Sequence, residues 1–353
     1  MTKPIRVALA PSRLGANPYL DDLARSFPPD RVVEVRAGWE ELSGRDAGRP
    51  ADIVHIQFIQ MLLDEMGARS DPRRASARYL RRLARLRKNG VAVTWTMHNL
   101  VSHESTSPRY DRFARRATAL VARRVFVHCR AAAAEVRRLW PLARVTVMSH
   151  PGHERAASND RAAARAALGI AEDARVVAIP GRIRGYKDVP GAVRALRDAA
   201  AESTVVVVAG APHEPRLEDE VRAAAGGDPR VRLLLRLLDD VEIDQVVAAS
   251  DVALAPYRRV LTSGMVALTS EQGVPTVAPA LGCLKEQLGE GGLFYAPGDL
   301  RSAADLALRT PLEDLRRRGG LVRKHVLSPN WEQVGVAYAD AYEQVLGRRA
   351  GYR

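Results

Sequence analysis

The sequence predicts an α/β protein built from two domains, each a parallel β-sheet covered by helices. Three observations predict this class. Short runs of β-branched residues alternate with longer Ala/Leu/Arg stretches of helical period, which is the pattern of successive βα units. The length of 353 residues fits two domains of about 150–200 residues each. The alternation loosens once, after residues 150–153, where a polar stretch leads into a further helix.

The first domain is expected to span residues 1–155 and to contain six strands. Each strand is a short β-branched run: Ile5–Ala10, Val32–Val35, Ile53–Phe58, Val91–Met97, Val125–His128 and Val145–Met148. Between the strands, apolar residues recur at helical spacing in four stretches: Pro18–Ser26, Arg74–Lys88, Tyr110–Ala122 and Ala131–Leu139.

The second domain is expected over residues 156–330, with the same alternation. Its six strands are Val176–Ile179, Thr204–Ala209, Val231–Leu234, Val252–Ala255, Thr276–Ala278 and Leu293–Tyr295. Its helices include Val189–Ala200, Arg216–Ala225, Asp240–Ala249, Met265–Glu271 and Leu300–Leu308. The remaining residues, 331–353, begin with an amphipathic helix (Trp331–Leu346) that we expect to pack back toward the N-terminal domain. Two similar halves predict two Rossmann-like domains facing a cleft.

Composition limits the class of protein and its partners. An apolar content of 46% and a charged content of 27% are typical of a soluble globular protein. The chain starts directly with a strand, without a signal peptide, and has only two cysteines, so we expect a cytoplasmic location. The net charge of +13 would attract phosphate-bearing substrates or anionic lipid. No nucleic-acid-binding motif accompanies this charge, so we expect no nucleic-acid partner.

The most informative segment is residues 179–189, IPGRIRGYKDV. A strand ends at Pro180-Gly181, and Arg182 and Lys187 follow five residues apart before a helix begins. In open α/β sheets, ligands bind beyond the carboxyl ends of strands, where loops and helix N-termini converge. An arginine fork and a lysine charge at this place suit a diphosphate, whose charge as a leaving group must be stabilised. The alternative is a solvated basic loop.

A second segment, residues 250–288, contains a strand, a Pro-Tyr turn and the small polar loop Thr262-Ser263-Gly264 before a helix. Backbone N–H groups and two hydroxyls at a helix start form a cradle for phosphate or sugar oxygens. The alternative is a plain helix N-cap without a ligand.

The order of these motifs resembles the GT-B glycosyltransferases. The shared pattern is GR-x4-K, an Asp-ended helix, Pro-Tyr, a small-residue loop, a helix and G-x-P, then Gly282 and Glu286, and it covers most of residues 175–346. It is most similar to the retaining family 4 and to relatives of bacterial polysaccharide β-mannosyltransferases. The N-terminal half matches more loosely, at Asp52–Phe58 and Thr94–Glu104. The resemblance implies a hexosyltransferase that uses a UDP- or GDP-linked sugar without a metal or other cofactor. Its acceptor would be a hydroxyl of a saccharide, a lipid-linked compound or a small molecule.

The resemblance also implies the site residues. In such enzymes the arginine and the lysine grip the donor diphosphate, so these roles carry over to Arg182 and Lys187. The loop after the first strand approaches donor or acceptor, and a simple strand–helix turn is the alternative there. The expected donor-binding residues are Gly15, Gly181, Arg182, Lys187, Tyr257, Thr262, Ser263, Gly264 and Glu271.

One departure from family 4 concerns its two glutamates, eight residues apart, which bind the transferred sugar and the ribose. Counting back from Gly273-Val274-Pro275, their positions hold Val260 and Leu268. Glu271, about one helical turn beyond Leu268, is the expected substitute. The departure leaves the donor and the anomeric outcome open.

The expected catalytic residue of the first domain is His98, at the carboxyl end of a strand. It matches a family 4 histidine that contacts the donor sugar, and a histidine satisfied by backbone is the alternative. His103 and Glu104 follow, and an imidazole or a carboxylate there would accept the acceptor proton in an inverting reaction. We therefore take His98, Glu104, Arg182 and Lys187 as the catalytic set. His98, His103 and Glu104 lack H-E-x-x-H spacing, so no metal site is expected.

Two alternatives to a transferase remain: a sugar-nucleotide epimerase or hydrolase of the same fold, and a catalytically degenerate binding subunit. A further feature is the helix Arg74–Lys88, which has arginines on one face and leucines on another. Such a face suits peripheral contact with an anionic membrane at its inner surface. A solvated arginine face over a leucine core is the alternative.

Overall fold

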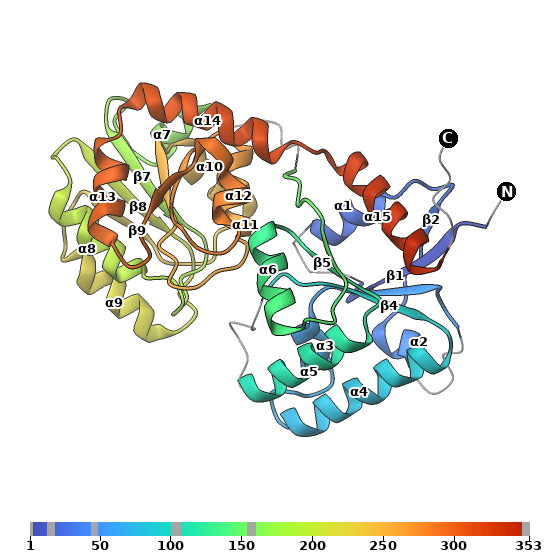
Figure 1. Ribbon diagram of the computed structural model, residues 1–353. Coiled ribbons are helices and arrows are strands. Elements are labelled where there is room, and N and C mark those ends of the chain that lie inside the picture. The colour runs from blue at the N-terminus through green and yellow to red at the C-terminus, as the bar shows by residue number, and fades with distance from the viewer. Residues whose placement is uncertain (1–2, 13–17, 44–48, 100–106, 154–159, 348–353) are drawn as a thin grey trace. The chain divides into compact units, whose positions relative to one another are not determined.

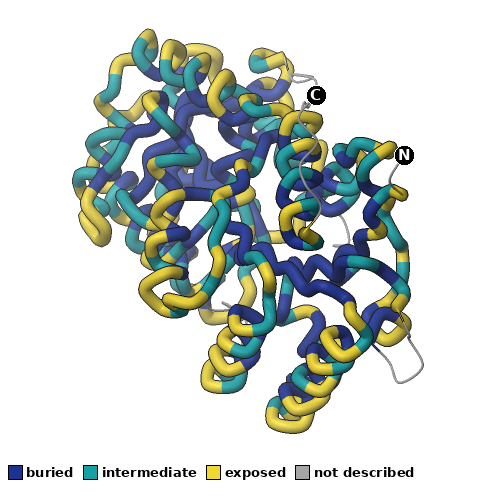
Figure 2. Tube along the Cα trace, turned by 45° about the vertical axis from the view of Figure 1, so that its right-hand side comes forward, coloured by how far each residue is buried: buried dark blue, intermediate teal, exposed yellow. Residues whose placement is uncertain are grey.

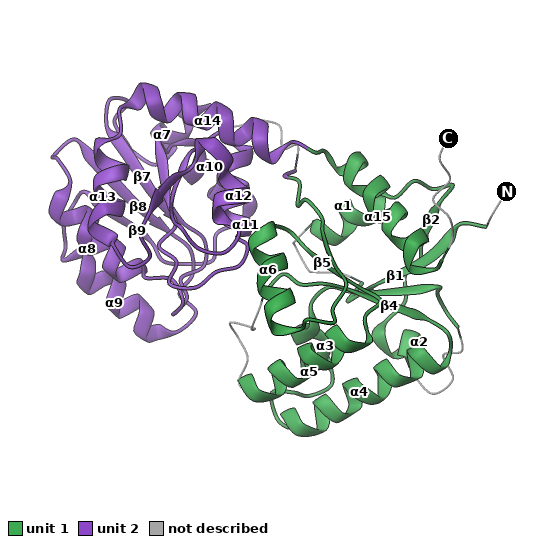
Figure 3. Ribbon diagram, viewed as in Figure 1, with its two compact units in different colours: residues 1–151, 329–353 green, residues 152–328 purple. Residues whose placement is uncertain are grey.

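The computed structural model describes residues 3–12, 18–43, 49–99, 107–153 and 160–347 (Figure 1). The chain forms two compact units (Figure 3). Unit 1 comprises residues 1–151 together with 329–353, and unit 2 comprises residues 152–328. The last segment of the chain thus belongs to the same unit as the first.

Unit 1 is a six-stranded parallel sheet with helices on both faces. Its strands are β1 (Ile5–Ala10), β2 (Val32–Glu34), β3 (Ile53–Ile56), β4 (Ala92–Thr96), β5 (Arg124–Val127) and β6 (Val145–Val147), in the spatial order β2-β1-β3-β4-β5-β6. Its helices are α1 (Tyr19–Ser26), α2 (Trp39–Ser43), α3 (Ile59–Glu65), α4 (Pro72–Lys88), α5 (Pro108–Val121), α6 (Arg130–Leu139) and α15 (Trp331–Val345).

Unit 2 repeats this architecture. Its strands are β7 (Arg175–Pro180), β8 (Thr204–Ala209), β9 (Val231–Leu234), β10 (Val252–Leu254), β11 (Thr276–Pro279) and β12 (Leu293–Tyr295), in the order β12-β11-β10-β7-β8-β9. Its helices are α7 (Arg161–Ala167), α8 (Val189–Ala199), α9 (Pro215–Ala225), α10 (Asp240–Ala248), α11 (Gly264–Glu271), α12 (Leu284–Leu288), α13 (Leu300–Arg309) and α14 (Leu312–Val326), with a short 3₁₀ turn at Gly289–Gly291. The two parallel sheets confirm the predicted α/β class, and every predicted strand is present.

Burial follows from the covering of both sheet faces. Every residue of β3 and of β4 is buried, as expected for strands with helices on both sides. The helices turn exposed faces outward, and Figure 2 shows these as yellow stretches around the dark-blue strands. No helix of the described part of the chain is both long and apolar enough to cross a bilayer.

Helix α15 completes the core of unit 1. Tyr338 and Tyr342 are buried against Ile5 and Phe126 of the sheet. The helix approaches α1 so closely that a Cβ on Gly335 would lie 1.8 Å from the carbonyl oxygen of Ser26. Glycine is therefore required at this crossing of the two helices.

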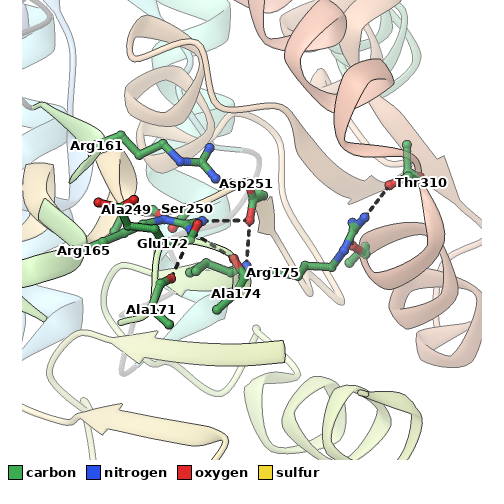
Figure 4. A network of polar contacts seen from close by, with 12 residues as sticks. Arg161, Arg165, Ala171, Glu172, Ala174, Arg175, Ala249, Ser250, Asp251 and Thr310 are labelled. Carbon is green, nitrogen blue, oxygen red and sulfur yellow. Dashed lines mark hydrogen bonds and ion pairs between the residues drawn. The ribbon is translucent and has the colours of Figure 1, made fainter. Parts of the chain in front are cut away.

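A buried ion-pair network attaches α7 to the sheet of unit 2 (Figure 4). Arg165 donates to Asp251 at 3.0 Å and to the carbonyl oxygens of Ala249 and Ala174 at 3.1 and 2.9 Å. Asp251 also accepts from the backbone N–H of Val176 at 2.7 Å. These residues lie where β7 and β10 begin, at the edge opposite the predicted phosphate loop. The network therefore has a structural role.

Candidate functional site

Two glycines shape the carboxyl edge of the sheet in unit 2. Gly181 follows β7 with φ of +92°, and Gly210 follows β8 with φ of +147°. A Cβ on Gly210 would lie 2.6 Å from the carbonyl carbon and oxygen of Gly181. Both positions require glycine, because L side chains rarely adopt these φ values and no space exists for one at Gly210. The two loops that leave neighbouring strands are therefore held in direct contact.

Lys187 is a buried cation at this edge. Its side chain is only 8% exposed, and its Nζ lies 5.4 Å from the centre of the Tyr257 ring. A Cβ on Gly181 would lie 3.5 Å from this Nζ, so the ammonium group sits beside the Gly181 turn. Burial, together with the charge of Arg184, lowers the pKa of Lys187 to about 8. Among the described residues Nζ has no carboxylate partner, so an anion here would be strongly stabilised.

Arg182 differs from Lys187 in exposure. It directly follows Gly181, its side chain is exposed, and it forms no ion pair with any residue that the structure describes. An exposed guanidinium and a buried ammonium therefore flank the same glycine turn. Two cations so placed could bind phosphate oxygens, and the predicted phosphate grip at this loop stays a prediction.

Ser263 is the N-cap of α11. Its Oγ accepts a hydrogen bond from the backbone N–H of Val266 at 3.2 Å and shares another with the Tyr257 hydroxyl at 2.6 Å. Gln287 bonds both backbone groups of Ser263, at 3.2 and 2.9 Å. The plain-cap alternative is thus realised for this hydroxyl, and a bond from it to the donor stays a prediction.

The first turn of α11 lies beside the Gly181 turn. Gly181, Lys187, Tyr257 and Met265 line one small cavity, and a Cβ on Gly181 would lie 2.8 Å from the Met265 Cε. Gly264 is exposed, with no atom within 4 Å of an added Cβ. The first N–H groups of a helix have no intrahelical acceptor and attract anions. Backbone groups of this turn thus complement the two cations.

The positions at which family 4 enzymes carry glutamates are packed apolar positions here. Val260 packs against the cluster that contains Tyr257 and Leu284, and Leu268 packs against Val274 and its neighbours. Neither position therefore carries an acidic side chain. The replacements therefore contribute to the core of unit 2.

Glu271 lies at the end of α11 that is farther from Ser263. It is buried, and its Oε1 accepts from the backbone N–H of His153 at 2.9 Å. A Cβ on Gly152 would lie 2.8 Å from the Glu271 Cγ, so this segment packs tightly on the carboxylate. Glu271 is eight residues beyond the Ser263 cap, which corresponds to about 12 Å along the helix axis. Its predicted role in donor binding remains untested.

In unit 1, His98 follows β4 and is buried among aromatic rings. Its ring stacks on Phe58, with ring centres 4.3 Å apart, and meets the edge of Tyr19 at 5.1 Å. Its Nε2 lies 2.9 Å from Gln57 Oε1, and its Nδ1 lies 3.3 Å from His128 Nε2. Residues that follow the neighbouring strands β3 and β5 thus hold both ring nitrogens.

The hydrogen bonds of His98 and His128 indicate which of their ring nitrogens carry protons. His128 Nδ1 faces the carbonyl oxygen of Met148 at 3.0 Å, and a carbonyl only accepts, so this nitrogen carries a proton. Burial lowers the pKa of His128 to about 3 and that of His98 well below its usual value, so both rings are neutral at pH 7. Gln57 Oε1 only accepts, so the single proton of the neutral His98 ring resides on Nε2 and is donated to Gln57.

Other predicted site residues differ in what the structure says of them. Gly15, His103 and Glu104 lie outside the described residues, and Thr262 is half-buried beside the α11 cap. No group of three or more His, Cys, Asp or Glu side chains with metal-binding geometry occurs in the described ranges. Gln57 and His128 were not predicted from the sequence. The signal for them is that a polar residue, Gln57, His98 or His128, follows within two residues of the end of each of three neighbouring parallel strands.

The sequence of this chain is similar to those of known glycosyltransferases. Residues 174–312 match the family described as glycosyl transferases group 1. The chain is 25% identical over 352 aligned residues to GDP-mannose:glycolipid 4-beta-D-mannosyltransferase of Xanthomonas campestris pv. campestris, covering 94% of this chain and 89% of the relative. It is 29% identical to D-inositol 3-phosphate glycosyltransferase of Saccharomonospora viridis, covering 74% and 67%.

Solved structures resemble the whole chain. Sucrose-phosphate synthase from Thermosynechococcus elongatus superposes with a TM-score of 0.74 at 18% identity, covering 98% of this chain and all of the other. Anabaena Alr3699/HepE, solved in complex with UDP and glucose, gives a TM-score of 0.71 at 13% identity, covering 96% and 100%. At these identities the likeness concerns the fold.

Proposed function

The chain is a glycosyltransferase of the GT-B fold and family 4 type, and we propose that it transfers mannose from GDP-mannose to a hydroxyl group of a glycolipid. The observation that supports GDP-mannose as the donor is the similarity to the mannosyltransferase, because this alignment covers nearly all of both chains. On this ground we propose GDP-mannose among the expected UDP- or GDP-linked donors. The same relative supports the lipid-linked compound among the expected acceptors.

The cations of unit 2 fit the chemistry at the donor phosphates. Transfer breaks the bond between the sugar C1 and the β-phosphate oxygen, so negative charge grows on the departing diphosphate. Lys187, buried without a carboxylate, and Arg182, exposed beside it, stabilise that charge. The acceptor oxygen forms the new bond to C1 and loses its proton to a base.

His98 is proposed to contact the transferred sugar, with a sugar hydroxyl displacing Gln57 or His128 from one of its ring nitrogens. Its pKa lies well below the usual value, so a neutral ring faces the substrate and the ring is a weak proton acceptor. The role of base therefore falls to Glu104 in this proposal, the other first-domain residue of the expected catalytic set.

Ligand-binding measurements test the donor. We expect GDP and GDP-mannose to raise the melting temperature, while UDP, ADP, dTDP and their sugar conjugates have little effect. Stabilisation by a different nucleotide alone would overturn the GDP assignment. Because no metal is proposed to take part, binding and transfer should persist in excess EDTA, and loss of both would overturn that point.

Transfer assays separate the remaining alternatives. With labelled GDP-mannose and glycolipid extracts, label should enter lipid only when acceptor is present. Consumption of the donor without acceptor would favour the hydrolase or epimerase. Donor binding without turnover on any acceptor would favour a degenerate subunit, the reading that apolar Val260 and Leu268 support.

A further inference from the structure

A second pocket, distinct from the small cavity of unit 2, lies in unit 1 at the amino edge of the sheet. Its volume is about 660 Å³, and it lies where the loops enter β4, β5 and β6 and where α15 ends. His98 lies beyond the opposite, carboxyl end of β4. A strand of this length places the two sites roughly 20 Å apart. The pocket is therefore separate from the proposed sugar-transfer site.

The charged residues that line this pocket in the described part of the chain are all arginines. These described lining residues include no Asp or Glu but five arginines, namely Arg87, Arg116, Arg123, Arg124 and Arg144. None of the five forms an ion pair with a described residue, although exposed arginines elsewhere in the unit, such as Arg25 and Arg69, pair with carboxylates.

Two of these arginines are held in place by neutral groups. Arg123 donates to the carbonyl oxygen of Val345 at 3.1 Å, and Arg124 donates to the Thr146 hydroxyl at 3.2 Å. The Nε of Arg124 is buried without a hydrogen-bond partner. Such a set of unneutralised guanidinium groups binds phosphate oxygens.

The rim of the same pocket is apolar. Leu142 is 86% exposed, Leu120 is 60% exposed and Leu139 is 41% exposed, and Trp140 lines the pocket beside them. Leucines this exposed gain free energy when they leave water. A soluble phosphate compound would account for the arginines but not for these leucines.

We propose that this pocket docks the protein on an anionic lipid bilayer. The arginines bind lipid phosphate groups, and Leu120, Leu139 and Leu142 enter the interface between head groups and acyl chains. This surface is not the arginine face of α4 considered from the sequence, where Arg82 pairs with Glu40.

The proposal is argued from the residues of the pocket alone and does not depend on the proposed donor. Joined to the proposed glycolipid acceptor, it has one consequence for the substrate. Because the pocket and His98 lie at opposite edges of the sheet, the acceptor head group should be long enough to span the roughly 20 Å between them.

Vesicle flotation with the full-length protein tests the proposal. We expect binding to phosphatidylcholine vesicles that contain phosphatidylglycerol and little binding to phosphatidylcholine alone. Arg116→Gln combined with Arg144→Gln should weaken binding about tenfold or more, and Leu142→Ala should weaken it further. The matched control is Arg73→Gln combined with Arg74→Gln, which removes the same charge from an exposed part of the unit.

Three results would overturn the proposal. One is equal weakening by the pocket and control variants, since net charge alone would then explain binding. Another is failure of the wild type to bind vesicles with phosphatidylglycerol. The third is calorimetric binding of inorganic phosphate, lost in the pocket variant, without vesicle binding, which would assign the pocket to a soluble ligand. Flotation needs no donor, so its result is independent of the GDP assignment, and melting temperatures verify folding.

Discussion

At the scale of single residues, Lys187 is retained at a cost to stability. Its pKa falls from 10.5 to about 8, so below pH 8 the folded protein holds a charge that the unfolded chain solvates better. This cost is fully present below pH 8 and disappears as pH rises from 8 toward 10.5. The shift corresponds to about 3 kcal/mol, which a diphosphate counter-charge would recover.

We therefore expect Lys187→Met to raise the free energy of unfolding at pH 7 by 1 kcal/mol or more, to about 3 kcal/mol at most, while weakening GDP binding at least tenfold. Arg182→Gln is the matched change, since its exposed side chain has no ion pair. It should weaken GDP binding with stability changed by less than about 0.5 kcal/mol.

Urea unfolding and calorimetry measure these quantities. Wild-type affinity for GDP should fall above pH 8, and that of the Met variant should not. Equal GDP affinity in both variants and the wild type would remove the proposed phosphate grip.

The buried histidines of unit 1 predict acid sensitivity. Burial lowers the pKa values of His55 and His128 to about 3, and that of His98 well below its usual 6.5. The stability they allow is fully present above pH 6.5 and is lost as pH falls toward 3, because the unfolded chain binds the protons first. Three such groups give a slope of about 4 kcal/mol per pH unit in that window.

Urea unfolding between pH 5 and 7.5, followed by the tryptophans of unit 1, measures this slope. His55→Gln should reduce the slope by about one third, even if it lowers stability at every pH. A slope that is the same for the variant and the wild type would contradict the assignment of His55.

Sequence patterns predict some of these residues and not others. Arg182 and Lys187 lie on one loop, so their spacing and the strand before them were enough to predict that they lie close together, and their role in donor binding stays a prediction. Gln57 and His128 reach His98 from separate strands, and only the sheet order β3-β4-β5 brings them together. That order is a tertiary property, which local spacing does not contain.

At the scale of elements, the strands were predictable and several helices were not. Helices α2 and α12 have five residues each, too few for a helical period to repeat. Helix α14 contains Gly319-Gly320, which weakens its propensity. The structure explains Gly319, because a Cβ there would lie 2.0 Å from the carbonyl oxygen of Gly273. Packing thus overrides a local signal that argues against a helix.

Substitutions at two glycines near α11 separate an effect on donor binding from an effect on packing. Gly264→Ala adds a methyl group where no atom lies within 4 Å, so the melting temperature should be kept or slightly raised. If the donor phosphates lie on this turn, GDP affinity should nevertheless fall.

Gly282→Ala is the contrasting change, since φ is +52° and the new Cβ would lie 2.4 Å from the carbonyl oxygen of Val260. It should destabilise unit 2 by about 2 kcal/mol or more. Thermal melts and GDP titrations of both variants check this. Unaltered GDP affinity in Gly264→Ala would show that the donor phosphates do not lie on the first turn of α11.

At the scale of the whole molecule, the C-terminal helix α15 packs into the same unit as the N-terminal strand β1. The sequence predicts a final amphipathic helix, but the partner of its apolar face is a matter of tertiary structure. In the structure Tyr342 of α15 bonds His55 of β3, with 2.7 Å between the hydroxyl oxygen and Nδ1. Unit 1 therefore cannot complete its core until the last helix has been synthesised, whereas unit 2 is one continuous segment.

This connectivity predicts that a fault in α15 acts on one unit only. Gly335→Ala forces α15 away from Ser26 and should speed amide hydrogen exchange in β1 and β3, leaving β7 and β8 protected. Val336→Ala, at an exposed neighbouring position, is the control and should leave both units unchanged. Hydrogen exchange read by mass spectrometry resolves the units in the full chain. Equal acceleration in both sheets would show that the units unfold as one, since the packing fault itself lies in unit 1.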